Sequence, residues 1–244
     1  MKTCIIIPVY NHEVAIVQVL AQLKNVGLPT LLVNDGSSEQ CSKILEECAE
    51  QQSAWLMLIN RPENGGKGAA LLDGFKAAKA LGYSHALQID ADGQHDLNDI
   101  PAFLKAGKQH PAALILGQPV FDSSAPKGRL LGRRLTNFWI AINTLSHAIA
   151  DGMCGFRLYP LAAVAELIGA TQLARRMAFD IDIVVRLYWQ GVEVINSPTH
   201  VQYPQHGVSH FKLWQDNLSI SKTHARLFFG MLRRFWQLLG RRGW

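Results

Sequence analysis

The 244-residue sequence predicts an α/β fold with a mostly parallel central sheet flanked by helices, followed by a C-terminal amphipathic helix. Three observations lead to this fold class. Short apolar runs alternate with amphipathic segments of about 10–15 residues, which is typical of right-handed βαβ units. Polar clusters directly follow several of the apolar runs. Basic residues gather at the C-terminus, where residues 211–244 carry a net charge of +6 while the rest of the chain carries −1.

The elements of the first half follow from local signals. Thr3–Val9 is apolar and β-branched, as expected of a buried strand, and the apolar residues of Val14–Lys24 recur at helical spacing. Thr30–Val33 is a second short strand, and Ser37 or Ser38 can cap a helix that runs to about residue 51. The alternation continues with strands at 55–59, 85–89 and 113–116 and helices at 68–80 and 97–108.

From about residue 126 the pattern changes, and this half is expected to supply the acceptor side of a crevice. Its spacing predicts helices at 130–150, 161–168 and 179–190 and a strand at 192–201. In the first half, Tyr10–Glu13, Asn34–Ser38 and Asp90–His95 all follow predicted strands. Because ligands of parallel sheets bind beyond the carboxyl ends of the strands, these clusters should converge on one site.

Composition narrows the class of protein. Apolar residues make up 48% and charged residues 18%, a globular balance without extended disorder. The four cysteines form no CxxC pair, so we expect structural thiols rather than zinc ligands. No stretch approaches the roughly 18 uninterrupted apolar residues of a membrane span. The basic C-terminus indicates an anionic membrane surface rather than nucleic acid, and we expect a cytoplasmic protein, peripheral on the inner face of the cell membrane.

The segment Asp90–His95, with the sequence DADGQH, is the most informative for chemistry. Asp90 and Asp92 are alternate residues at a strand end, so their side chains can face one site. Two carboxylates and the amide oxygen of Gln94 are hard ligands that suit Mg²⁺ or Mn²⁺. The alternative is an Asp-rich turn that closes the strand.

Two other turns could bind a nucleotide. Asn64–Gly68 precedes a predicted helix, so its backbone can approach phosphates and Lys67 can neutralise them. The segment lacks P-loop spacing, and the alternative is a simple glycine-rich turn. Asn34–Ser38 alone is most often an Asx turn.

Together and in this order, the motifs resemble those of family-2 glycosyltransferases of the GT-A fold, and most of all the dolichyl- and polyprenyl-phosphate mannose synthases. The resemblance spans about residues 3–211. It is carried by PVYNHE (8–13), NDGSS (34–38), NGGKG (64–68), DADGQH (90–95), CGFRLY (154–159), MAFDIDIVVR (177–186) and HGVSHF (206–211). It implies an inverting, metal-dependent transfer from a UDP- or GDP-sugar to a lipid or polyprenyl-phosphate acceptor.

The resemblance also implies roles for the matching positions. The nucleotide-binding positions are Pro8, Tyr10, Glu13, Asn34, Asp35, Lys67 and Asp90. The positions that hold Mg²⁺ or Mn²⁺ are Asp90, Asp92 and Gln94.

On the acceptor side, the resemblance places Arg157 at the floor near the sugar, with a structural ion pair as the alternative. An acceptor phosphate is expected near Arg129, Arg133, Arg134 and His210. The alternative for the three arginines is a solvated basic face.

The sequence departs from the mannose synthases at three places. Asn34 replaces an aspartate of the nucleoside motif, which puts the base preference in doubt because Asn offers a donor as well as an acceptor. Pro204 and His210 lie where phosphate-binding cations are expected. Asp180 replaces a neutral amide. A hydroxyl acceptor must lose a proton, so we expect Asp180 as general base for a hydroxyl-bearing lipid, with Asp182 in reserve and polyprenyl phosphate as the other acceptor.

The division of the chain is expected at residue 211. Residues 1–211 would form the GT-A domain and residues 212–244 a basic amphipathic helix that lies in a membrane interface. Its apolar stripe is Ile220, His224, Leu227, Phe228, Met231, Phe235 and Leu238. The alternative is a helix packed on the catalytic domain or in a dimer. Two other classes fit less well. A sugar nucleotidyltransferase is expected to carry a long Gly-rich, basic segment after the first strand, where this chain has PVYNHE, and a non-catalytic membrane-binding module would not need Asp90, Asp92, Gln94 and Lys67.

Overall fold

The structure, a computed structural model, describes residues 1–121, 127–202 and 213–241. A seven-stranded sheet forms its centre, with the strand order β3-β2-β1-β4-β6-β5-β7. The strands are β1 (Thr3–Val9), β2 (Thr30–Asn34), β3 (Leu56–Asn60), β4 (His85–Gln88), β5 (Leu114–Phe121), β6 (Arg157–Pro160) and β7 (Val194–Val201). Among the strand pairings of the described residues, only the two of β6, with β4 and β5, are antiparallel. The mostly parallel α/β sheet expected from the sequence is therefore confirmed.

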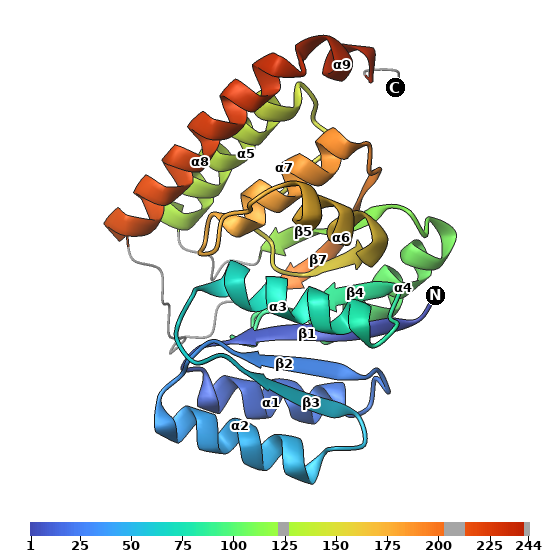
Figure 1. Cartoon of the computed structure of the whole chain (residues 1–244), viewed down its shortest axis with the longest axis vertical. Coiled ribbons are helices and arrows are strands. Elements are labelled where there is room, and N and C mark those ends of the chain that lie inside the picture. Colours follow the sequence, from blue (N-terminus) through green and yellow to red (C-terminus); the bar gives the residue numbers. More distant parts are fainter. Residues whose placement is uncertain (122–126, 203–212, 242–244) are drawn as a thin grey trace.

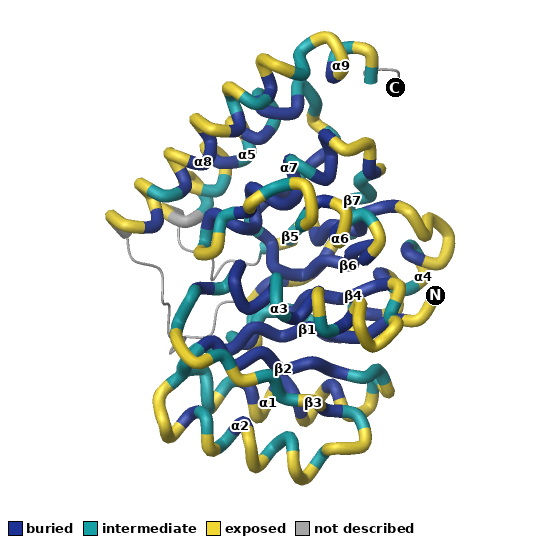
Figure 2. The backbone as a smooth tube through the Cα atoms, in the orientation of Figure 1, coloured by how far each residue is buried: buried dark blue, intermediate teal, exposed yellow. Residues whose placement is uncertain are grey.

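Helices cover both faces of this sheet (Figure 1). They are α1 (Glu13–Leu23), α2 (Glu39–Gln51), α3 (Lys67–Ala80), α4 (Ile100–Gln109), α5 (Lys127–Thr144), α6 (Leu161–Ala170), α7 (Phe179–Gln190), α8 (Leu213–Arg233) and α9 (Phe235–Gly240), with a short 3₁₀ turn at Leu97–Asp99. The helices α1, α2 and α4 pack on one face, and α3, α5, α6, α7 and α8 pack on the other. The strands β1, β2, β4 and β6 are buried along their whole length (Figure 2).

The order of the strands reverses between β1 and β4. The chain passes from β1 out to β2 and β3 and then returns to β4 on the other side of β1. Ligands of such sheets bind at this reversal, beyond the carboxyl ends of the strands. Residues Asp90–His95 and Tyr10–Glu13 follow the two strands that flank it.

The structure departs from the prediction at one helix, at the end of β5, which continues from the predicted position 116 to Phe121, and at one strand that was not predicted. The helix expected at 130–150 ends at Thr144, because Leu145 takes a left-handed conformation with φ 50°. The strand β6 was not expected, since it has four residues and begins with a charged one.

The C-terminal helix α8 lies beside α5 (Figure 1) and also packs on α7. Its buried apolar side chains, Ile220, Leu227 and Met231, belong to the same core as the sheet. The apolar stripe that the sequence placed in a membrane interface is thus largely the face that packs on the protein. The division at residue 211 stays a prediction.

Candidate active site

The turns after β1 and β2 are joined at the carboxyl edge of the sheet. Asn11, which has φ 50°, accepts a hydrogen bond from Ser38 N at 2.8 Å, and its own N–H donates to Ser37 Oγ at 3.1 Å. Asn34 is buried, and its amide donates to Ser42 and Asn60, both at 3.0 Å. The Asn34 amide therefore stabilises this turn through two donated hydrogen bonds, which an Asp side chain could not donate.

The other predicted nucleoside residues lie close to these turns. Pro8 is buried in the last part of β1, Tyr10 is half-buried in the turn that follows, and Glu13 is half-buried as the first residue of α1. Glu13 Oε2 is buried and has no hydrogen-bond partner within the residues that the structure describes. An unsatisfied buried oxygen costs free energy unless a ligand or water donates to it.

Asp35 organises the glycine-rich segment. Its two carboxylate oxygens accept hydrogen bonds from Gly65 N at 3.0 Å and from Gly66 N at 2.7 Å, and Arg61 forms an ion pair with it. The backbone is too close for side chains here, since a Cβ on Gly36 would lie 2.5 Å from Glu63 C. The N–H groups expected to approach phosphates are thus already bound by Asp35.

Lys67, the first residue of α3, joins two distant parts of the chain. Its ammonium lies 2.8 Å from Asp90 Oδ1 and 2.7 Å from Asp180 Oδ2. Burial opposes the positive charge, but the two carboxylates, Asp180 foremost, raise the pKa of Lys67 above its usual range. The predicted nucleotide-binding residues Lys67 and Asp90 and the predicted base Asp180 therefore form one charged group.

Asp90 is closely packed within this group. A Cβ on Gly155 would lie 2.0 Å from Asp90 Oδ2, so the Asp90 carboxylate contacts the backbone of Gly155 directly. Burial opposes its charge, yet Lys67 and His95 together hold the pKa of Asp90 well below its usual range. His95 stacks on Phe156 with ring centroids 5.3 Å apart.

Asp92 and Gln94 continue the same loop. Asp92 Oδ1 accepts a hydrogen bond from Gln94 N at 3.1 Å, and burial followed by the negative charge of Asp90 raises the pKa of Asp92. A half-buried pair of carboxylates and an amide oxygen fits a divalent cation, whose charge would offset their mutual repulsion.

A second acidic group lies further along the loop. The ligand atoms of Asp96, Asp99 and His200 lie within 4.8 Å of one another. Asp96 already caps Asn98 N at 2.9 Å, and Asp99 accepts from His200 N at 3.0 Å. These bonds give both carboxylates a structural role.

Arg157 and Asp182 are deeply buried. The guanidinium of Arg157 donates to three carbonyl oxygens, those of Cys154, Gly152 and Asp180, and to Tyr159. Asp182 accepts from Arg186 and Arg226, both at 2.6 Å, and from Ala174 N at 2.9 Å. Each side chain therefore holds several segments together, whatever else it does.

The predicted acceptor arginines are only partly described. Arg133 donates to Asp151 at 2.5 Å and lies over the Phe121 ring, whereas Arg134 is exposed on α5. The side chains of Arg129 and His210 lie outside the described residues.

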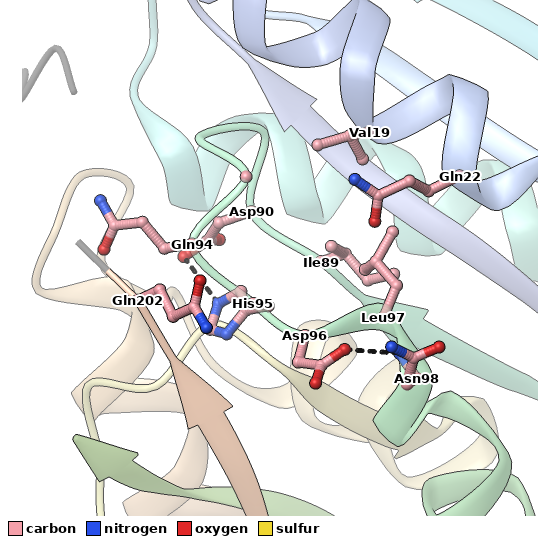
Figure 3. Close-up of a pocket in the computed structure, with 11 residues that line it drawn as sticks. Val19, Gln22, Ile89, Asp90, Gln94, His95, Asp96, Leu97, Asn98 and Gln202 are labelled. Carbon is pink, nitrogen blue, oxygen red and sulfur yellow. Dashed lines mark hydrogen bonds and ion pairs between the residues drawn. The ribbon is translucent and has the colours of Figure 1, made fainter. Parts of the chain in front are cut away.

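A cavity of about 320 Å³ adjoins the loop Asp90–His95 (Figure 3). Val19 and Gln22 of α1 form one wall, and Asp90 and the residues from Gly93 to Asn98 form another, with Gln202 directly after β7. It shares Asp90 and Gln94 with the candidate site. A role for His95 and the contact between Lys67 and Asp180 were not predicted from the sequence. His95 could have been found, because it lies inside the DADGQH motif.

The architecture and this site define a class of protein, the GT-A glycosyltransferases. The solved structure of glucosyl-3-phosphoglycerate synthase from Mycobacterium tuberculosis, in complex with Mn²⁺, UDP and phosphoglyceric acid, superposes with a TM-score of 0.67. The match covers 94% of this chain and 78% of that one, at 13% sequence identity.

Residues 4–168 match glycosyl transferase family 2, and the chain belongs to this family. It is 30% identical over 234 residues to an uncharacterised protein of Methanocaldococcus jannaschii, covering 92% of this chain and 98% of the relative. It is 25% identical over 214 residues to the polyprenol monophosphomannose synthase of Mycolicibacterium smegmatis (85% and 80%). It is 27% identical over 201 residues to a dolichyl-phosphate β-glucosyltransferase of Trichomonas vaginalis, covering 74% of this chain but 59% of that protein.

Proposed function

We propose that this family-2 glycosyltransferase moves a sugar from a nucleotide-sugar donor to the phosphate of a polyprenyl-type lipid. The environment of Asp180 carries the proposal. Its carboxylate is buried and lies 2.7 Å from Lys67 Nζ, so taking up a proton would break this ion pair. A phosphate acceptor is already anionic and needs no general base. The relatives from Mycolicibacterium and Trichomonas are named for products or acceptors that are lipid phosphates, and these names support a lipid-phosphate acceptor.

This preference reverses the expectation from the sequence, which favoured a hydroxyl acceptor with Asp180 as base. In the proposed reaction Asp180 instead positions Lys67 beside Asp90. Asp90, Asp92 and Gln94 would hold Mg²⁺ or Mn²⁺, which supplies positive charge for the leaving diphosphate when bound. Glu13 and Asp35 lie on the nucleoside side of the same edge.

Two acceptors that differ only in the phosphate test the proposal. Purified protein is incubated with Mn²⁺ and radiolabelled UDP- and GDP-sugars, and with either undecaprenyl phosphate or undecaprenol. We expect transfer to the phosphate alone. Transfer to undecaprenol alone, reduced roughly 10²–10⁴-fold by Asp180→Asn, would instead establish Asp180 as a general base.

The metal has its own test. Asp92→Ala removes one carboxylate of the proposed ligand set and should abolish turnover, while the circular-dichroism melting curve stays close to that of the unchanged protein. Excess EDTA should also stop the reaction, and added Mn²⁺ should restore it. Full activity in EDTA would refute the metal assignment.

We further propose that the paired helices α5 and α8 place the protein on an anionic membrane. No helix in the described part of the chain is long and apolar enough to cross a bilayer. Nine of the fifteen exposed large apolar side chains of the described residues lie on α5, α8 and α9. On the C-terminal helices they are Trp214, Leu218, Phe229, Leu232 and Trp236.

Exposed cations lie on the same helix as several of these exposed apolar side chains. Lys222 and Arg233 are exposed on α8, and each Lys or Arg near an anionic surface adds about 1 kcal/mol of binding. The variant Trp214→Ser/Trp236→Ser should therefore sediment less with phosphatidylglycerol vesicles.

The matched control is Val14→Ser/Met57→Ser, which changes two exposed apolar residues elsewhere. If both double variants sediment as the unchanged protein does, the C-terminal face is not the contact.

A further inference from the structure

The candidate site lacks positive charge for a diphosphate. Asp90, Asp92 and Asp180 carry three formal negative charges, and Lys67 and Arg157, which both pair with Asp180, carry two positive charges, so one divalent cation leaves the group with a net charge of only +1. A nucleotide-sugar diphosphate adds about two more negative charges, and enzymes that release such groups stabilise them with Arg, Lys or metal ions.

The backbone of the glycine-rich segment does not supply this charge. Gly65 N and Gly66 N donate to Asp35, and Ala69 N donates to the carbonyl of Arg175 at 2.9 Å. Three of the N–H groups around the start of α3 are therefore bound within the protein. The positive charge that meets an incoming phosphate must therefore come from side-chain cations.

Most described arginines of the catalytic part are already engaged by acids. Arg61 pairs with Asp35 and Asp73, and Arg157 lies fully buried near Asp180. The other arginines in ion pairs are Arg133, Arg186 and Arg226. Among the arginine side chains described before α8, three remain exposed and form no ion pair: Arg134, Arg175 and Arg176.

Arg175 and Arg176 lie on the loop between α6 and α7, which rests on the glycine-rich segment. Arg176 Nη1 donates to Asn64 Oδ1 at 3.3 Å, and a Cβ on Gly66 would lie 2.6 Å from Arg176 Cγ. Glycine at position 66 thus makes room for the arginine. Directly before the two arginines, Asp182 accepts a hydrogen bond from Ala174 N, and the carbonyl of Arg176 accepts one from Phe179 N, so the backbone that carries the two cations is held on both sides.

From this geometry we infer that Arg175 and Arg176 form a phosphate-binding pair at the rim of the crevice. The inference rests on the proposed function and adds two phosphate-binding residues that the motifs do not contain. Their ligand is a phosphate group, either of the donor diphosphate or of the lipid acceptor. Arginine suits both because its guanidinium binds phosphate oxygens in a bidentate manner.

The test uses Arg175→Ala, Arg176→Ala and the double variant of the full chain. The matched control is Lys79→Ala/Lys108→Ala, which removes two exposed cations at the ends of α3 and α4 far along the sequence from the crevice motifs. Calorimetry measures the affinity for UDP and for GDP with Mn²⁺, and kinetics measure KM for undecaprenyl phosphate.

A charged hydrogen bond contributes enough that each single variant should lose about tenfold or more in the affected constant. Weaker UDP or GDP binding assigns the pair to the donor. A raised KM for undecaprenyl phosphate with unchanged nucleotide affinity assigns it to the acceptor. Arg175→Lys/Arg176→Lys keeps the charge and should fall between the unchanged protein and the alanine variants.

Nucleotide affinity and KM both within twofold of the unchanged protein would overturn the inference. If the alanine double variant does not fold, Arg175→Gln/Arg176→Gln replaces it under the same criteria. A protein that binds nucleotide through these arginines but transfers no sugar to any lipid would refute the proposed function and leave the phosphate-binding pair standing.

Discussion

Replacing Asp182 with asparagine separates a structural role from a catalytic one. The side chain is fully buried on α7. Its Oδ1 lies 2.6 Å from Arg186 Nε, and its Oδ2 lies 2.6 Å from Arg226 Nη2. Asparagine has nearly the same volume but no charge, and one of its terminal groups is a donor that would face an arginine. We expect Asp182→Asn to destabilise the protein rather than to stop the chemistry.

The magnitude follows from burial. Removing one partner of a buried ion pair costs about 3–5 kcal/mol, and we take the lower end because the Arg226 side chain is 47% exposed and partly screened by water. For a chain of this length, about 1 kcal/mol lowers Tm by roughly 2–4 °C, so a cost of about 3 kcal/mol corresponds to roughly 6–12 °C.

Urea denaturation followed by circular dichroism measures the loss. Arg226→Ala should cost about 1 kcal/mol or less, since Arg186 still pairs with Asp182, and Lys222→Ala one turn away serves as the control. Transfer activity, measured well below Tm, should fall at most about tenfold in Asp182→Asn. An unchanged unfolding curve together with a loss of more than about 10²-fold in transfer would show that Asp182 is a catalytic base.

Two other predictions concern packing and pH. Gly155→Ala should reduce donor turnover at least about tenfold, because the added Cβ would lie 2.0 Å from Asp90 Oδ2; Gly169→Ala, with open space around it, should leave turnover unchanged in the same assay. Burial lowers the pKa of His224 to about 4, below the value near 6.5 of an exposed histidine, so protons favour the unfolded chain. The free energy of unfolding should therefore fall as pH drops from about 6.5 through 4, and His224→Gln should show a smaller slope in urea titrations; equal slopes would contradict this.

Local sequence signals predict most of the fold. The boundaries of β1 and α7 match the structure, because a continuous apolar run and a helix stopped by the left-handed Gly191 are each determined locally. The strand β6 could not be recognised, since four residues beginning with Arg157 become a strand only through pairing with β4 and β5. Tertiary contacts override local propensity at such positions.

The site was predictable in its members but less so in its contacts. Asp90 and Lys67 belong to different motifs, and Asp180 lies 113 residues beyond Lys67, so their ion pairs depend on how the helices pack. The packing of the apolar face of α8 on the protein could not be predicted from hydrophobic periodicity either. Helical spacing finds an apolar stripe through Leu227, but it does not say whether that stripe meets lipid or the protein's own core.

The contact between Asp182 and Arg226 gives the enzyme an order of assembly during translation. The loop that carries Arg175 and Arg176 is held at Ala174 by a carboxylate whose second arginine arrives 44 residues later in the chain. Domains fold from the N-terminus as they leave the ribosome, so the sheet can form while α8 is still unmade. The nascent enzyme then has its nucleotide motifs in place before the anchor of this loop is complete, and the helix proposed to meet the membrane is the one that completes it.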